Sequence, residues 1–118
     1  MMRNILILLA FLAPGGAAAA ELWCMPDTLC RNDVCKPTTD EESSVRLNDL
    51  DSATPTLRMN ANDIPMTRTA KGDTVQWQGD DPDGGTDVLA WRPSDGAYVL
   101  VRKVDGRTFK ATGRCEVQ

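Results

Sequence analysis

Two Asp-Gly pairs in the last third of the chain constrain the fold more than any other feature of the sequence. Asp95-Gly96 and Asp105-Gly106 separate three apolar runs, "VLAW" at 88–91, "AYVLVRKV" at 97–104 and "TFKATGRCEV" at 108–117. Tight hairpin turns require residues with positive φ, and Asp-Gly between alternating runs is a strong hairpin signal. The pattern therefore predicts a three-stranded antiparallel meander.

Upstream of this meander, apolar residues continue to alternate with polar ones. The alternating pairs are Val45 and Leu47, Leu57 and Met59, Ile64 and Met66, and Val75 and Trp77. Short period-two segments bounded by turn residues indicate strands with one face in water. Strands that recur about every ten residues favour a small antiparallel all-β barrel or sandwich. No helical period is convincing beyond residue 20, and "KPTTDEESS" at 36–44 is typical of a surface loop.

The first 20 residues have the three regions of a secretory signal peptide. Arg3 gives a positive start, residues 5–12 are apolar, and Ala18-x-Ala20 is a small-residue cleavage site after helix breakers. The apolar run is far shorter than the ~20 residues that cross a bilayer. The alternative is an apolar core helix. We expect residues 1–20 to be removed, leaving residues 21–118 as one periplasmic or secreted domain without a membrane span.

The four cysteines are predicted to form two disulfides. An even cysteine count in an exported chain is typical of disulfides, whereas zinc and redox sites need spacings or histidines that this chain lacks. The polar segment "RNDV" allows Cys30 to bridge Cys35, which leaves Cys24 for Cys115. The rival pairing joins Cys24 to Cys30 and Cys35 to Cys115.

The charge of the chain limits the classes of partner. Residues 1–20 contain one basic residue, Arg3, and no acidic one, so residues 21–118 hold 12 basic and 17 acidic side chains, a net charge of −5. Such a domain does not attract nucleic acid or anionic lipid, and a basic protein is the partner that its charge favours. The basic residues near the C-terminus are interpreted as a solvated face rather than an anion site; they are Arg102, Lys103, Arg107, Lys110 and Arg114.

The segment "GDDPDGGTD" at 79–87 is the strongest candidate for a metal site. An EF-hand loop needs oxygen ligands at its positions 1, 3 and 5, but a loop starting at Asp80 places Pro82 and Gly84 there. We therefore predict a plain hairpin turn and no metal. Copper is the other candidate, through Met25, Met59 and Met66, but core packing is the favoured interpretation of these methionines.

Catalysis has little support in the sequence. The chain contains no histidine to act as a base at neutral pH, and disulfide-bonded cysteines cannot act as nucleophiles. We expect a protein that is not an enzyme, has no cofactor, and has a binding or structural role. The tryptophans are expected mostly in the core, although Trp91 and Tyr98 flank the "PSDG" turn and are a hypothetical aromatic platform for a partner.

The layout of the chain resembles the periplasmic and membrane-bound inhibitors of c-type lysozyme. Like them, it opens on an aromatic residue, Trp23, before Cys24, and closes with Cys115 in its last strand. The family's Ser-Gly-x-x-Tyr loop is matched in part by 94–98, "SDGAY". The resemblance implies an eight-stranded barrel and, as an alternative function, inhibition of a basic cell-wall hydrolase. It places Ser94, Asp95, Gly96 and Tyr98 at the partner surface. Trp91 is added to this candidate surface by its place beside the turn, not by the resemblance.

Overall fold

The structure, a computed structural model, describes residues 20–39, 41–59 and 62–118, with the side chain of residue 42 left out. The predicted signal peptide lies outside the described residues, apart from Ala20. Ten strands and one short 3-10 turn follow in chain order: β1 Leu22–Arg31, β2 Val34–Pro37, η2 Glu41–Ser43, β3 Val45–Asn48, β4 Thr56–Met59, β5 Asn62–Pro65, β6 Thr67–Ala70, β7 Val75–Asp80, β8 Thr86–Trp91, β9 Ala97–Val104 and β10 Arg107–Val117.

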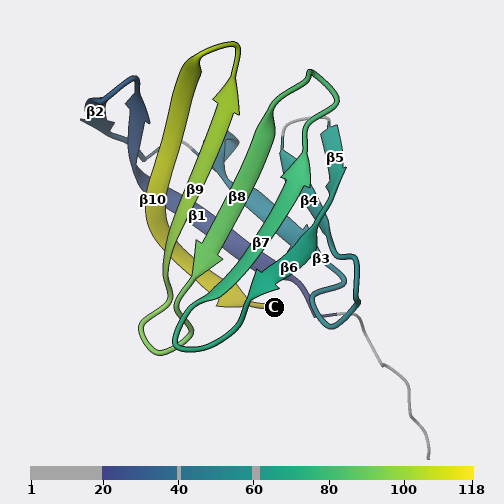
Figure 1. The fold of residues 1–118 in the computed structure, drawn as a ribbon. Helices are drawn as coiled ribbons and strands as arrows, with labels where there is room; N and C mark the ends of the chain where they lie inside the picture. The colour runs from purple at the N-terminus through teal and green to yellow at the C-terminus, as the bar shows by residue number, and fades with distance from the viewer. Residues whose placement is uncertain (1–19, 40, 60–61) are drawn as a thin grey trace, which may run out of the picture.

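The strands form one antiparallel sheet that curls into a nearly closed barrel (Figure 1). The order is β5-β4-β3-β1-β10-β9-β8-β7-β6, and β2 is added to the outer part of β1 as a hairpin. β5 and β6 are consecutive segments separated by Met66; β5 pairs with β4, and β6 pairs with β7. One bent stretch of chain thus joins the two ends of the sheet. The predicted all-β barrel is confirmed.

The bend between β5 and β6 passes close to the backbone of β7. A Cβ atom on Gly79 would lie 2.5 Å from the carbonyl oxygen of Pro65 and 2.6 Å from Sδ of Met66. Real Cβ atoms do not come so close to their neighbours, so only glycine fits at this position of β7. Closure of the barrel therefore depends on Gly79.

The predicted C-terminal meander is confirmed as β8, β9 and β10. These strands pair in sequence, and the turns between them contain Gly96 with φ 82°, and Asp105 and Gly106 with φ 50° and 74°. Positive φ at these positions is the property that the Asp-Gly pairs predicted. The meander forms one wall of the barrel (Figure 1).

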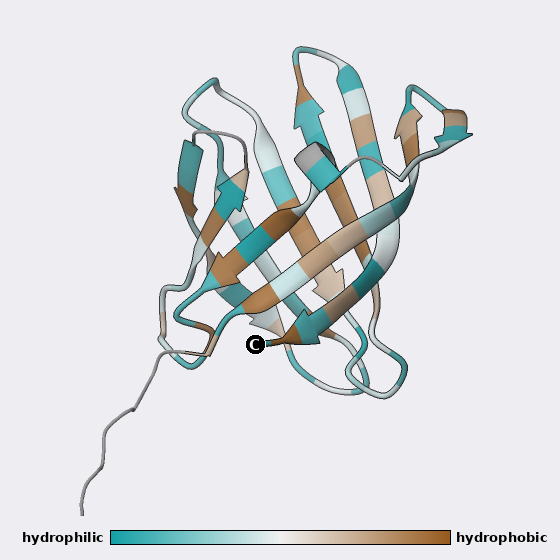
Figure 2. Ribbon diagram, turned by 180° about the vertical axis from the view of Figure 1, so that it is seen from behind, coloured by the Kyte–Doolittle hydropathy of each residue, from teal (hydrophilic) through white to brown (hydrophobic). Residues whose placement is uncertain are grey.

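Alternating side chains of the strands fill the barrel. Apolar and polar colours accordingly alternate along several strands of the ribbon (Figure 2). The fully buried apolar side chains are Leu22, Cys24, Leu47, Pro55, Leu57, Ile64, Met66 and Leu89. Met59 and Trp77 are buried as expected. The expectation of a core position is wrong for Met25 and Trp23, which are 43% and 39% exposed.

Both predicted disulfides are confirmed. Cys24 and Cys115 are direct cross-strand neighbours on β1 and β10, and Cys30 and Cys35 are direct neighbours on β1 and β2. The segment between Cys30 and Cys35 contains a tight hairpin turn, because Asn32 and Asp33 both have positive φ, 48° and 72°. The sequence did not predict that β2 is a strand.

A β-bulge in β1 decides which side chains enter the barrel. Pro26 pairs with Gly113 and Thr28 pairs with Thr112, so Asp27 is an extra residue without a cross-strand partner. Strand residues alternate between faces, and one extra residue reverses the alternation. Leu22, Cys24 and Pro26 are buried before the bulge, whereas Leu29 and Arg31 face the interior after it.

Among the residues that the structure describes, no helix is long and apolar enough to cross a membrane. Two disulfides are consistent with an extracellular or periplasmic protein, because such bonds persist in oxidising compartments.

Candidate ligand site at the open end of the barrel

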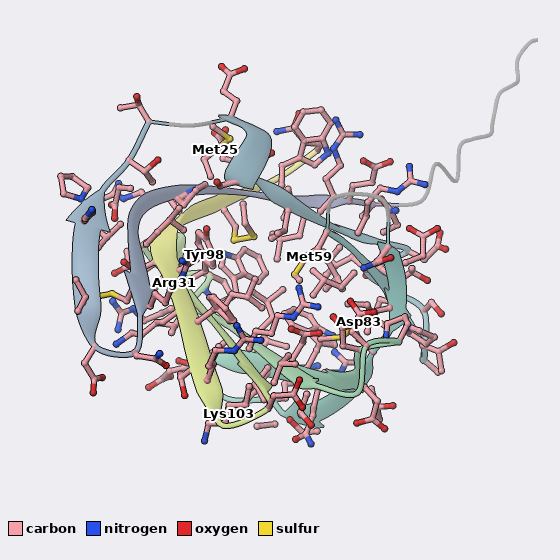
Figure 3. All side chains as sticks on the ribbon, turned by 90° about the horizontal axis from the view of Figure 1, so that it is seen from above. Met25, Arg31, Met59, Asp83, Tyr98 and Lys103 are labelled. Atoms are coloured by element: carbon pink, nitrogen blue, oxygen red, sulfur yellow. A yellow bond between two sulfur atoms is a disulfide. The ribbon has the colours of Figure 1, made fainter. Side chains whose placement is uncertain are left out.

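The two ends of the barrel differ. The end that carries the Cys24–Cys115 bridge is packed with side chains, whereas the end that carries the β1–β2 hairpin contains a cavity of about 980 Å³. Figure 3 looks along the barrel and shows Arg31 and Met59 reaching the interior from different strands. The apolar floor comes from β1, β3, β4, β9 and β10 and consists of Leu29, Val45, Met59, Leu100, Phe109 and Ala111. Val34 and Pro37 of β2 also line the cavity.

The charged lining of this cavity is cationic. Arg31, Lys36, Arg102 and Lys110 line it, and no aspartate or glutamate does so among the side chains that the structure describes. The whole chain has a net charge of −4 at pH 7, so composition does not account for this concentration of positive charge. The cavity therefore combines an apolar floor with a positive rim.

Strand register places two of these cations on the inner face of the β1–β2 hairpin. Lys36 is the cross-strand partner of Leu29, and Arg31 is the partner of Phe109 on β10; such partners project from the same face of a sheet. The guanidinium carbon of Arg31 lies 5.4 Å from the centroid of the Phe109 ring, within cation–π distance. Arg31 and Lys36 make none of the ion pairs formed within the described part of the chain.

Arg102 has a different environment, because three aspartates surround it. It forms an ion pair with Asp81, and its Nη2 and Nε lie 3.6 Å from Oδ2 of Asp83 and 3.8 Å from Oδ1 of Asp87. The side chains of Asp81 and Asp87 are fully buried, and that of Arg102 is 21% exposed. The positive charge of Arg102 is therefore neutralised within the protein.

Burial dominates the electrostatics of Asp87. It raises the pKa of this carboxyl from 3.8 to about 6; Arg102 opposes the shift and the negative charge of Asp81 adds to it. Neither carboxylate oxygen of Asp87 accepts a hydrogen bond from a described group. A buried carboxylate without such bonds is costly in its ionised form, so Asp87 titrates close to neutral pH.

The loop between β7 and β8, which supplies Asp81 and Asp83, is a hairpin turn, as predicted. The amide of Asp81 donates to the carbonyl of Gly85 at 2.7 Å, and the amide of Asp83 donates to Oδ1 of Asp81 at 2.8 Å. Gly84 has φ 93°. Among the described residues, no three histidine, cysteine, aspartate or glutamate side chains are grouped to hold a metal ion.

The aromatic pair predicted as a partner platform is largely internal. Trp91 and Tyr98 are direct cross-strand partners, as expected, but Tyr98 is only 2% exposed and Trp91 is half-buried. Burial also raises the pKa of the Tyr98 hydroxyl above its ordinary value, and the charge of Asp27 adds to this shift. The hypothesis of an exposed platform is thus wrong for Tyr98, because its strand position points into the barrel.

The other predicted partner residues lie on the β8–β9 turn, at the end of the barrel away from the cavity (Figure 1). Ser94 and Asp95 are exposed. Asp95 accepts hydrogen bonds from Nε and Nη2 of Arg92, at 3.0 and 2.6 Å, and from the amide of Ala97. These bonds, chiefly those from Arg92, lower the pKa of Asp95 to about 2. The structure does not bring this turn together with the cavity.

The basic residues near the C-terminus divide between the two faces of the sheet, as the strand pattern predicted. Arg102 points inward, whereas the other four are exposed: Lys103, Arg107, Lys110 and Arg114. No pattern of residues in the sequence indicated a site at Arg31 and Lys36. Their inward orientation depends on the bulge at Asp27, and a single extra residue has no recognisable pattern.

No protein-family model matches the chain, and searches of curated proteins and of solved structures found no match.

Proposed function

We propose that the protein is an exported, non-catalytic binding domain that takes a small molecule with an apolar part into the open end of its barrel. The observation that carries the proposal is the cavity of about 980 Å³ with its floor of six apolar residues. Ligand sites commonly have volumes of ~300–1,000 Å³ and apolar walls, and the mouth of a β-barrel is a frequent position for them.

The rest of the molecule suits a rigid scaffold for such a site. The opposite end of the barrel holds buried leucines and the buried Cys24–Cys115 bridge, so the walls of the cavity extend from a packed core. A preformed cavity binds without a large ordering cost. The non-catalytic part of the proposal rests on the sequence, which has no histidine, and on the pairing of all four cysteines.

The proposal is tested by titrating the mature protein with N-phenyl-1-naphthylamine, a neutral dye that fluoresces in apolar surroundings. We expect saturable binding that Ala111→Leu weakens, because this change fills the floor of the cavity. Thr112→Leu is the matched control, since the adjacent residue of β10 points to the opposite face. Absence of saturable binding to the folded wild type, or equal loss in both variants, would contradict the proposal.

Inhibition of c-type lysozyme remains the second candidate, because Ser94 is exposed on a turn that the Arg92–Asp95 pair holds in place. If this proposal is right, the protein inhibits lysozyme and Ser94→Ala reduces the inhibition. The buried Tyr98 is not expected to contact the enzyme directly. A lack of inhibition by the wild-type protein would exclude this function without affecting the ligand proposal.

A further inference from the structure

The cavity also carries information about the charge of its ligand. We infer, on the basis of the proposed function, that the ligand is an anionic amphiphile whose acid group lies at Arg31 and Lys36 and whose aliphatic part lies on the apolar floor. The charges on the cavity wall are of one sign: Arg31 and Lys36 are cationic, and no described lining residue is acidic.

Arg31 is placed to hold an acid group. The carbon of its guanidinium lies 5.4 Å from the centroid of the Phe109 ring, and the group has five N–H donors, more than a contact with one ring occupies. These donors match the two oxygens of a carboxylate. Lys36 projects from the same face of the hairpin and adds a second positive charge. Neither side chain is paired with a carboxylate in the described part of the chain.

Arg102 does not compete for the acid group, although it also lines the cavity. Asp81, Asp83 and Asp87 place three carboxyl groups around its single positive charge. An anion at this position would be repelled by the aspartates, whereas an anion at the β1–β2 hairpin meets uncompensated cations. The two sides of the cavity thus orient the ligand, with its acid group toward β1 and β2.

The apolar lining decides what the rest of the ligand is. Leu29, Val45, Met59 and Leu100 come from four different strands and bound the interior below the hairpin. A free inorganic anion would leave this surface in water, whereas an aliphatic chain would cover it at a gain of ~25 cal/mol per Å². A carboxylate that carries an alkyl chain of about ten carbons is the simplest molecule that would contact both the apolar floor and the cationic rim.

The test compares decanoate, decanol and decyltrimethylammonium as competitors of the neutral dye, each below its micelle concentration. We expect decanoate to bind most tightly and the ammonium compound most weakly. We expect Arg31→Gln with Lys36→Gln to weaken decanoate binding roughly fivefold or more, the effect of two partly exposed charge contacts. The matched control is Lys103→Gln with Arg107→Gln, which removes two exposed cations outside the cavity and should leave decanoate binding unchanged.

The outcomes separate this inference from the proposed function. If the dye binds and decanol competes as well as decanoate, or if the Arg31 and Lys36 variant weakens both equally, selection for an anion is refuted and the binding function stands. If neither the dye nor any ten-carbon compound binds to the folded wild type, the proposed function itself is wrong. Acetate serves as the control for the acid group alone. If acetate binds as tightly as decanoate, the inference that the ligand has an aliphatic part is refuted.

Discussion

Replacing Asp87 with asparagine should stabilise the protein at neutral pH, although it removes a charged residue beside an arginine. The carboxyl is fully buried, lies 3.8 Å from Nε of Arg102, and accepts no hydrogen bond from a described group. Arg102 keeps its ion pair with Asp81 in the variant. Asparagine has nearly the same shape as the protonated carboxyl and cannot ionise, so it removes the cost of a buried negative charge.

The sign and size of the effect follow from the pKa. The pKa of Asp87 in the folded protein is about 6, against an ordinary value of 3.8. A raised pKa in the folded state means that the favourable contribution of the protonated group is complete below pH 3.8 and is lost as the pH rises through about 6. A difference of about two in pKa corresponds to at most ~3 kcal/mol. Above pH 7, the free energy of unfolding of Asp87→Asn should therefore exceed that of the wild type by up to ~3 kcal/mol.

Urea unfolding between pH 3 and pH 8 measures the effect. The quantity to follow is the stability of the variant minus that of the wild type, because carboxyl groups distant from Asp87 contribute equally to both. Asp83→Asn is the matched control, since Asp83 also lies near Arg102 but is exposed, and this variant should not be more stable than the wild type. A variant less stable than the wild type at pH 8 would refute the reasoning, because attraction to Arg102 would then outweigh burial.

Three further predictions concern stability. Replacing both Cys24 and Cys115 with serine should lower the free energy of unfolding by ~4.5 kcal/mol, and replacing both Cys30 and Cys35 should lower it by ~2 kcal/mol. The chain-entropy model predicts this difference because the closed loops span 91 and 5 residues. Equal losses in urea unfolding would contradict the prediction. Gly79→Ala should destabilise the barrel by ~1–3 kcal/mol, whereas Gly72→Ala, where a Cβ meets nothing within 4 Å, should change the free energy of unfolding little. Calcium should leave the melting temperature unchanged, and a rise of several degrees at sub-millimolar calcium would show a site that the β7–β8 turn was not expected to form.

The sequence predicts the fold best where local chemistry requires one backbone conformation. Asp105 and Gly106 need positive φ, so the β9–β10 hairpin follows from two residues. Closure of the barrel could not be predicted in this way. It depends on the bend between β5 and β6 and on the space over Gly79, and the contact joins residues that are distant along the chain.

The exposure of Trp23 could have been predicted from the alternation of faces along β1. The expectation of a buried tryptophan, which was based on residue type alone, was wrong. Cys24 is buried in its bridge with Cys115, so its two neighbours on β1 must point outward. The ring of Trp23 is covered instead from outside the barrel, with the guanidinium carbon of Arg46 3.9 Å from its centroid. The general tendency of tryptophan to be buried was a weaker guide than alternation along the strand.

The candidate site was the least predictable part, because it depends on the bulge at Asp27. Without the bulge, an unbroken alternation from Leu22 and Cys24 would place Leu29 and Arg31 on the outer face of β1. A bulge has no reliable pattern of residue types. Gly113 was a partial signal, since a Cβ at this position would collide with the backbone of Met25, but a glycine in a strand has several explanations.

The short Cys30–Cys35 bridge makes most sense as a device that shapes the site. Closing a loop of five residues stabilises the fold less than half as much as closing the loop of 91, and the turn at Asn32 and Asp33 already forms the hairpin. The bridge links the outer face of β1 to the outer face of β2. Each cysteine adjoins a cation of the inner face, since Arg31 follows Cys30 and Lys36 follows Cys35. Fixing the two strands against each other therefore fixes the spacing of the two charges before a ligand arrives, which lowers the ordering cost of binding.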